Sequence, residues 1–160
     1  MKRFISLTIF AALLGASLFT SGCAGKVLKG NDASGKKIYL GPVPLENTEA
    51  YQSFLTSSRS EVDKQNYIFK RLKTEEAQKL SYFHDGTWYS WLEAYRGGNW
   101  LIRNRYKKGQ DARTFIKNYV WRSETTGKPH LIKYPDDSIQ EAYYVLLNEL
   151  DLLDETLARA

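Results

Sequence analysis

The chain has 160 residues, with 23 Lys or Arg and 18 Asp or Glu, and a net charge of +5. Residues 23–160 carry 21 basic and 18 acidic side chains; this net charge of +3 is too small to indicate nucleic-acid binding. The single cysteine, Cys23, excludes a framework of internal disulfides. The length fits one domain with its own core.

The N-terminus has the layout of an export signal. Met1 is followed by two basic residues, residues 4–19 are mostly apolar, and Ser21 and Gly22 precede Cys23. The apolar run is shorter than the roughly 20 residues of a membrane span. This segment resembles the lipobox of bacterial lipoproteins, with Thr20 where Leu is usual. The resemblance implies that residues 1–22 are a signal peptide and that lipids on Cys23 anchor the protein. An ordinary cleaved signal and an uncleaved anchor helix are the alternatives.

The residues after Cys23 bear on location and on the tether. Ala24 follows the cysteine, and in Gram-negative lipoproteins an Asp there favours the inner membrane. In such a host the resemblance therefore implies the periplasmic face of the outer membrane. Residues 23–46 are rich in Gly, Pro and small polar residues, which predicts a flexible tether of roughly 25 Å. Ile38 to Leu40 is a candidate edge strand within it.

Helical periodicity begins at Asn47, which we expect to cap a helix. Apolar residues then recur on one stripe as far as Leu72, and the polar residues 56–60 are a candidate break between two helices. Residues 79–83 and 87–89 predict a strand pair joined by the turn His84-Asp85-Gly86.

Ser90 and Glu93 have the spacing of a capping box, which predicts a helix toward Tyr106. Gly97-Gly98 lies inside this helix and is expected to weaken or kink it. Asp111 is expected to cap a further helix over residues 112–120, which has one apolar face.

The C-terminal part predicts a strand over residues 130–134, a turn over 135–137, and a last helix that starts with a second capping box, Ser138 and Glu141. Apolar residues on this helix follow a heptad pattern. They are Ile139, Tyr143, Leu146, Leu150, Leu153 and Leu157. This face packs either on the core of its own domain or, from Tyr143 onward, on a partner helix.

Together these elements predict an α+β fold: a small helix-rich domain, residues 47–160, with a short antiparallel strand pair and a long C-terminal helix.

The sequence holds no recognisable catalytic set. Past Cys23 there is no thiol, and His84 and His130 lack neighbours at metal-ligand spacing. Glu93 and Asp85 are explained by a capping box and a turn, so a pair of catalytic carboxylates is not favoured. We therefore expect no enzyme activity, no catalytic residue, no metal and no cofactor.

Aromatic residues offer a candidate binding surface instead. Trp88, Trp91, Tyr95 and Trp100 fall on the second predicted strand and the helix after it. We expect a non-enzymatic binding or assembly module that acts on another envelope component, protein or glycan. A peptidoglycan- or exopolysaccharide-binding protein and a pilot protein for a secretion pore are the alternatives, and a homodimer is possible through the heptad face.

Residues 60–155 also resemble small exported proteobacterial proteins grouped as a domain of unknown function. The segments that carry the resemblance are Phe83-His84-Asp85-Gly86, Tyr89, Glu93-Ala94, Arg105-Tyr106, Phe115-Ile116, Arg122-Ser123, Thr126-Gly127-Lys128-Pro129 and Ile132-Lys133. The resemblance implies a compact α+β domain of the envelope and no assigned activity. Within it, we expect the loop 123–129 to be shaped by side-chain hydrogen bonds.

Overall fold

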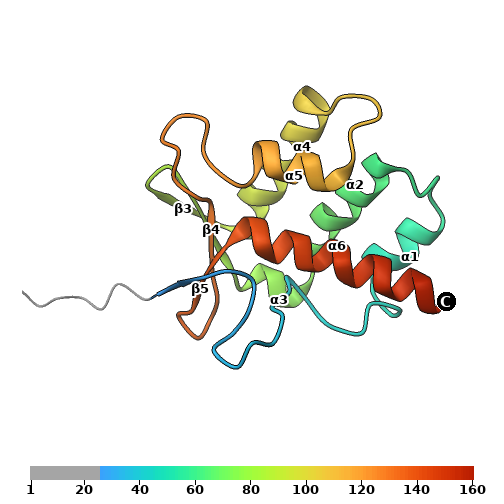
Figure 1. Cartoon of the computed structure of the whole chain (residues 1–160), viewed down its shortest axis with the longest axis horizontal. Coiled ribbons are helices and arrows are strands. Elements are labelled where there is room, and N and C mark those ends of the chain that lie inside the picture. The colour runs from blue at the N-terminus through green and yellow to red at the C-terminus, as the bar shows by residue number, and fades with distance from the viewer. Residues whose placement is uncertain (1–25) are drawn as a thin grey trace, which may run out of the picture.

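The computed structural model describes residues 26–160. The predicted signal peptide and Cys23 lie outside the described residues. The described part has six helices and a five-stranded mixed sheet in the order β1-β5-β4-β2-β3, which confirms the predicted α+β class (Figure 1). No helix within residues 26–160 has the length and apolar character needed to cross a membrane.

The elements follow one another in a simple order. The strands are β1 (Val27–Leu28), β2 (Ser81–His84), β3 (Thr87–Tyr89), β4 (Leu131–Lys133) and β5 (Ile139–Glu141). The helices are α1 (Glu49–Leu55), α2 (Glu61–Arg71), α3 (Glu75–Gln78), α4 (Trp91–Arg105), α5 (Ala112–Tyr119) and α6 (Ala142–Arg159).

Local sequence signals set most helix starts. Ser90 and Glu93 form the predicted capping box of α4, and the Asp111 side chain accepts a hydrogen bond from the first turn of α5. The predicted break after α1 is also present, and Ser60 starts α2 with a capping box of its own. The predicted cap at Asn47 is wrong by one residue, because the Thr48 side chain accepts the hydrogen bond instead.

The hairpin β2–β3 forms as predicted. Asp85 and Gly86 both have positive φ, 45° and 91°, which matches the twist that a two-residue hairpin turn requires. Phe83 faces Trp88 across this pair, and β4 extends the sheet on the other side of β2.

The predicted capping box at Ser138 and Glu141 is wrong. Residues 139–141 form β5, which pairs with β4 and with β1, and α6 starts at Ala142. The reason is the turn before it: Asp136 accepts hydrogen bonds from the backbone and side chain of Ser138, and Asp137 has a φ of 64°. This turn reverses the chain into a hairpin before the helix begins.

The predicted tether is also wrong over its described part. Val27 and Leu28 form an edge strand beside β5, and Leu40 and Leu45 are buried in the core. Polar side chains from the end of the chain hold this segment, since the Gly30 amide donates to Gln140 at 2.9 Å. The domain therefore starts by residue 27, four positions after Cys23, and not at residue 47.

The heptad face of α6 belongs to the core. Leu146, Leu150 and Leu153 are buried, and Tyr143 and Leu157 pack against the same cluster. The prediction of a partner-helix face is therefore wrong. The helix lies across the domain with α1, α2 and α5 on one side and the sheet at its start (Figure 1).

One buried ion pair connects three parts of the chain. The Arg71 Nε donates to the Glu149 carboxylate at 2.8 Å, and both side chains are 0% exposed. The same carboxylate accepts from the Leu40 amide at 2.6 Å, and Arg71 also donates to the Pro42 carbonyl at 2.9 Å. The pair thus fastens the N-terminal segment to α2 and α6.

Removal of one partner of this pair should be costly. We expect Arg71→Met to lower the free energy of unfolding by about 3–5 kcal/mol, because it leaves the Glu149 carboxylate buried without its counter-charge. The matched control is Arg113→Met. It removes exposed ion pairs of 2.8 and 3.0 Å to Asp151 and Asp154, which lie on α6, the helix that also carries Glu149. It should cost about 0–1 kcal/mol. Urea unfolding measures both, and equal losses would contradict this account.

Candidate functional site

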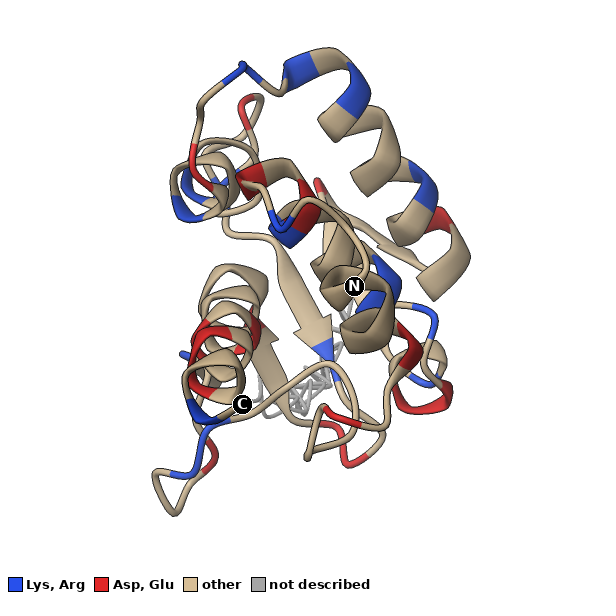
Figure 2. Cartoon of the chain, turned by 90° about the vertical axis from the view of Figure 1, so that its right-hand side faces the viewer, with Lys and Arg blue, Asp and Glu red and all other residues tan. Residues whose placement is uncertain are grey.

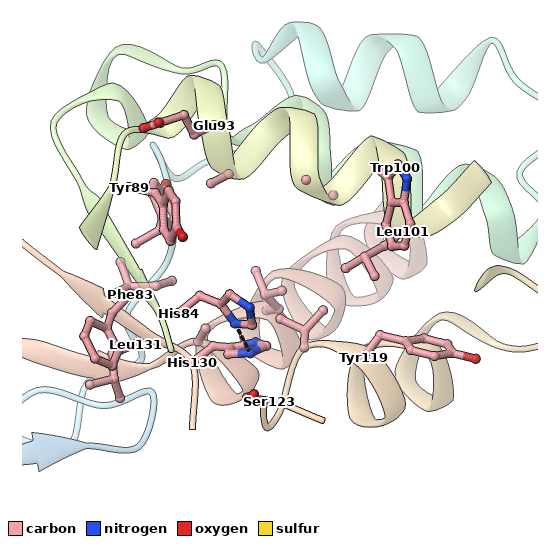
Figure 3. Close-up of a pocket in the computed structure, with 18 of the residues that line it drawn as sticks. Phe83, His84, Tyr89, Glu93, Trp100, Leu101, Tyr119, Ser123, His130 and Leu131 are labelled. Carbon is pink, nitrogen blue, oxygen red and sulfur yellow. Dashed lines mark hydrogen bonds between the residues drawn. The ribbon is translucent and has the colours of Figure 1, made fainter. Parts of the chain in front are cut away.

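The candidate site is a pocket of about 460 Å³ between α4 and the β2 side of the sheet (Figure 3). Its volume lies in the range of small-molecule sites. The base is apolar, with residues from α2, β4 and α6. These are Ile68, Phe69, Leu72, Ile132, Ala142 and Leu146.

Helix α4 forms one wall, and two adjacent glycines shape it. A Cβ at Gly98 would lie 2.0 Å from the Phe69 ring, so α4 approaches α2 too closely for any side chain there. A Cβ at Gly97 would meet no atom within 4 Å, so this position is open at the pocket wall. Helix α4 is therefore continuous where the sequence predicted a weakening or kink. Gly98 allows close packing on α2, and Gly97 leaves space at the pocket.

The opposite wall carries two histidines in contact. His84 ends β2, His130 precedes β4, and the His84 Nδ1 and His130 Nε2 are 2.8 Å apart, joined by a hydrogen bond (Figure 3). Burial lowers the pKa of His130, and the neighbouring His84 lowers it further. The neutral form of His130 is therefore favoured at the pocket wall.

Asp85 links the β2–β3 turn to the loop before β4. Its carboxylate accepts hydrogen bonds from the Thr126 hydroxyl at 2.6 Å and the Ser123 hydroxyl at 2.7 Å, and these bonds lower its pKa. The Ser123 Oγ accepts in turn from the amides of Thr125 and Thr126. The prediction that side-chain hydrogen bonds shape the loop 123–129 is thus confirmed.

This arrangement is suited to binding. The hydroxyl of Ser123 donates to the Asp85 carboxylate at 2.7 Å, and the same carboxylate lies 3.6 Å from the His84 Nε2. Within residues 26–160 no group of three or more His, Cys, Asp or Glu is placed to hold a metal ion. What the pocket offers is an apolar interior with a histidine pair on one wall.

The four predicted aromatic site residues have different surroundings. Trp100 lines the pocket and is 54% exposed, whereas Tyr95 lines a second hollow of about 170 Å³ and has the Lys73 ammonium over its ring. Trp88 packs against Phe83, with ring centroids 5.1 Å apart, and Trp91 is the first residue of α4. Of the four, only Trp100 lines the pocket, and that all four form one binding surface stays a prediction.

Sequence reasoning missed the histidine pair. His84 and His130 are 46 positions apart, and no spacing rule joins them. A signal was present, however, because both lie in or beside the short motifs around Asp85 and around Ser123 that carry the resemblance to exported proteins. These two motifs meet in space through Asp85.

Comparison with known proteins adds no relative: no protein-family model, curated protein or solved structure matches this chain.

The histidine pair predicts a pH dependence of stability. Because the pKa of His130 is lowered in the folded state, the unfolded chain takes up a proton first as the pH falls below about 6.5. Folding stability should then decrease from about pH 6.5 downward, until folded His130 is itself protonated. We expect His130→Gln to reduce this decrease. Denaturant unfolding at several pH values tests the difference between the two proteins.

NMR titration provides a direct check, because the chain has only two histidines. His130 should titrate below its unfolded value, and the loop 123–129 should respond at the same pH. An ordinary pKa for His130, or an unchanged pH dependence in His130→Gln, would count against the assignment.

Proposed function

We propose that this protein is a lipid-anchored module of the cell envelope, non-enzymatic, which binds another envelope component by taking an apolar group of that component into the pocket beside α4. The pocket of about 460 Å³ carries the proposal, since a concave, mostly apolar interior with an exposed tryptophan at its wall is typical of a binding site. The lipobox at Cys23 supplies the anchor.

The position of the anchor supports this arrangement. Since β1 starts four residues after Cys23, a chain of this length reaches at most about 14 Å, and the lipids would hold the domain close to the membrane. In the sheet order, β1 forms one edge and β3 the other, with β2 beside it. At about 4.8 Å per strand, the strands that line the pocket, β4, β2 and β3, lie roughly 10–19 Å from the anchored edge. The pocket is thus set apart from the attachment point.

A glycan ligand is the second candidate, and exposed tryptophans favour it. Trp88 is 43% exposed and Trp100 is 54% exposed, and sugars bind on such rings. Of the two, only Trp100 lines the pocket, whose apolar interior supports a non-glycan group better.

The anchor is tested by Cys23→Ser. We expect the variant to move from the membrane fraction to the soluble fraction after cell lysis, because two or more acyl chains give stable anchoring and none would remain. Fractionation with immunoblotting measures the change, and Ser21→Ala serves as the control that should stay in the membrane. Full membrane retention of Cys23→Ser would refute lipidation.

The pocket is tested by Gly97→Phe, which places a ring where a Cβ meets open space. The probe is the dye anilinonaphthalene sulfonate, which pairs an apolar ring system with one negative charge. We expect saturable fluorescence with the wild type and at least about tenfold weaker binding to Gly97→Phe.

Gly97→Ala is the matched control. It should keep dye binding and add about 0.5–1 kcal/mol of stability, because alanine favours the helix over glycine. Cooperative urea unfolding shows that each variant is folded. Equal dye affinity in all three proteins would contradict the pocket as the site, and displacement of the dye by peptidoglycan fragments would favour the glycan candidate.

A further inference from the structure

Charge is segregated along this chain. Residues 103–128 contain eight Lys or Arg and two Asp or Glu, a net charge of +6, whereas the rest of residues 26–160 has 13 basic and 16 acidic residues, a net charge of −3. In Figure 2 the basic segments gather at the end of α4 and in the chain that follows, and acidic segments predominate on α6 and in the lower half. The modest net charge of the whole chain conceals this asymmetry.

The positive charge lies beside the pocket. We define the basic rim as six exposed residues at the end of α4 and in the facing loop: Arg103, Arg105, Lys107, Lys108, Arg122 and Lys128. Arg105 and Arg122 themselves line the pocket. A contact of 3.5 Å between Arg105 and Glu124 shows that the helix end and the loop are neighbours.

The two acidic residues of this segment are already engaged. The Asp111 carboxylate caps α5 by accepting from the Thr114 amide at 2.8 Å, and Glu124 is paired with Arg105. Lys107, Lys108 and Lys128 form no ion pair with any residue of the described chain. The rim therefore keeps a positive potential next to an apolar opening.

We propose that the partner is an acidic protein segment that inserts one large apolar side chain into the pocket and lays its carboxylates on the basic rim. This inference rests on the proposed function and names the class of its ligand. Charge complementarity selects an acidic partner, and the pocket selects an apolar anchor, as in interfaces where a buried side chain is surrounded by a polar margin. A nucleic acid or a plain polyanion would use the rim without the pocket.

The fold also favours a protein partner over the membrane. The C-terminal end of α4, which precedes Lys107 and Lys108, lies at the top of Figure 1, away from β1 and the N-terminal segment. A lipid on Cys23 would bring the β1 side to the bilayer, so the rim points toward other envelope components. The membrane is therefore the less suitable source of negative charge.

The test uses three fluorescent peptides: one rich in Asp and Glu with a central Phe, the same peptide with Ala in place of Phe, and a Lys-rich peptide with Phe. We expect the first to bind best, with an affinity that falls as salt is added. The double variant Lys107→Glu/Lys108→Glu should weaken its binding on the order of tenfold. The matched control is Lys36→Glu/Lys79→Glu, which makes the same change of net charge at exposed lysines outside the rim and should stay within about threefold.

Each other outcome overturns the inference. Equal binding of the Phe and Ala peptides would show that the pocket is not the anchor site. Capture by phosphatidylglycerol vesicles that also displaces the peptide would assign the rim to anionic lipid. If no peptide binds while the dye still distinguishes Gly97→Phe from the wild type, the acidic partner is wrong and the pocket proposal stands.

Discussion

The buried ion pair between Arg71 and Glu149 is the interaction on which the arrangement of this domain depends. Neither side chain has access to water, so each needs the other, and the carboxylate also holds the Leu40 amide. Through these contacts the N-terminal segment, α2 and α6 are fixed together. Since α2 and α6 form the base of the pocket through Phe69 and Leu146, this pair also fixes the relative position of the two helices at the base.

The sequence predicted those features that short-range chemistry decides. The hairpin at Asp85-Gly86 and the capped starts of α4 and α5 need only neighbouring residues, and all are present. The start of α6 was misplaced because Ser138 and Glu141 satisfy the spacing of a capping box. A local rule matched there, but strand pairing with β4 on one side and β1 on the other prevailed.

The features that were missed depend on residues about 40 to 120 positions apart. Residues 26–46 have the composition of a tether, yet Gln140, Asn148 and Glu149 supply partners for their backbone. An argument from composition assumes that a segment must bury enough apolar surface by itself to fold. Here the rest of the domain buries the apolar side chains of this segment. The histidine pair could not be predicted either, because it also joins residues far apart in the sequence. The same holds for the pocket, which forms only when α4 packs on α2.

In the proposed binding, the two parts of the candidate site would act on different steps. Exposed charges such as those of the rim attract a partner from a distance and chiefly affect the association rate, and salt weakens them. A buried apolar contact acts after the encounter and chiefly affects the dissociation rate. Specificity therefore falls mainly to the pocket, where the spacing of α4 from the sheet decides which side chain fits. Gly98 sets how closely α4 approaches α2 at the base of the pocket, because any larger residue would push α4 away from Phe69.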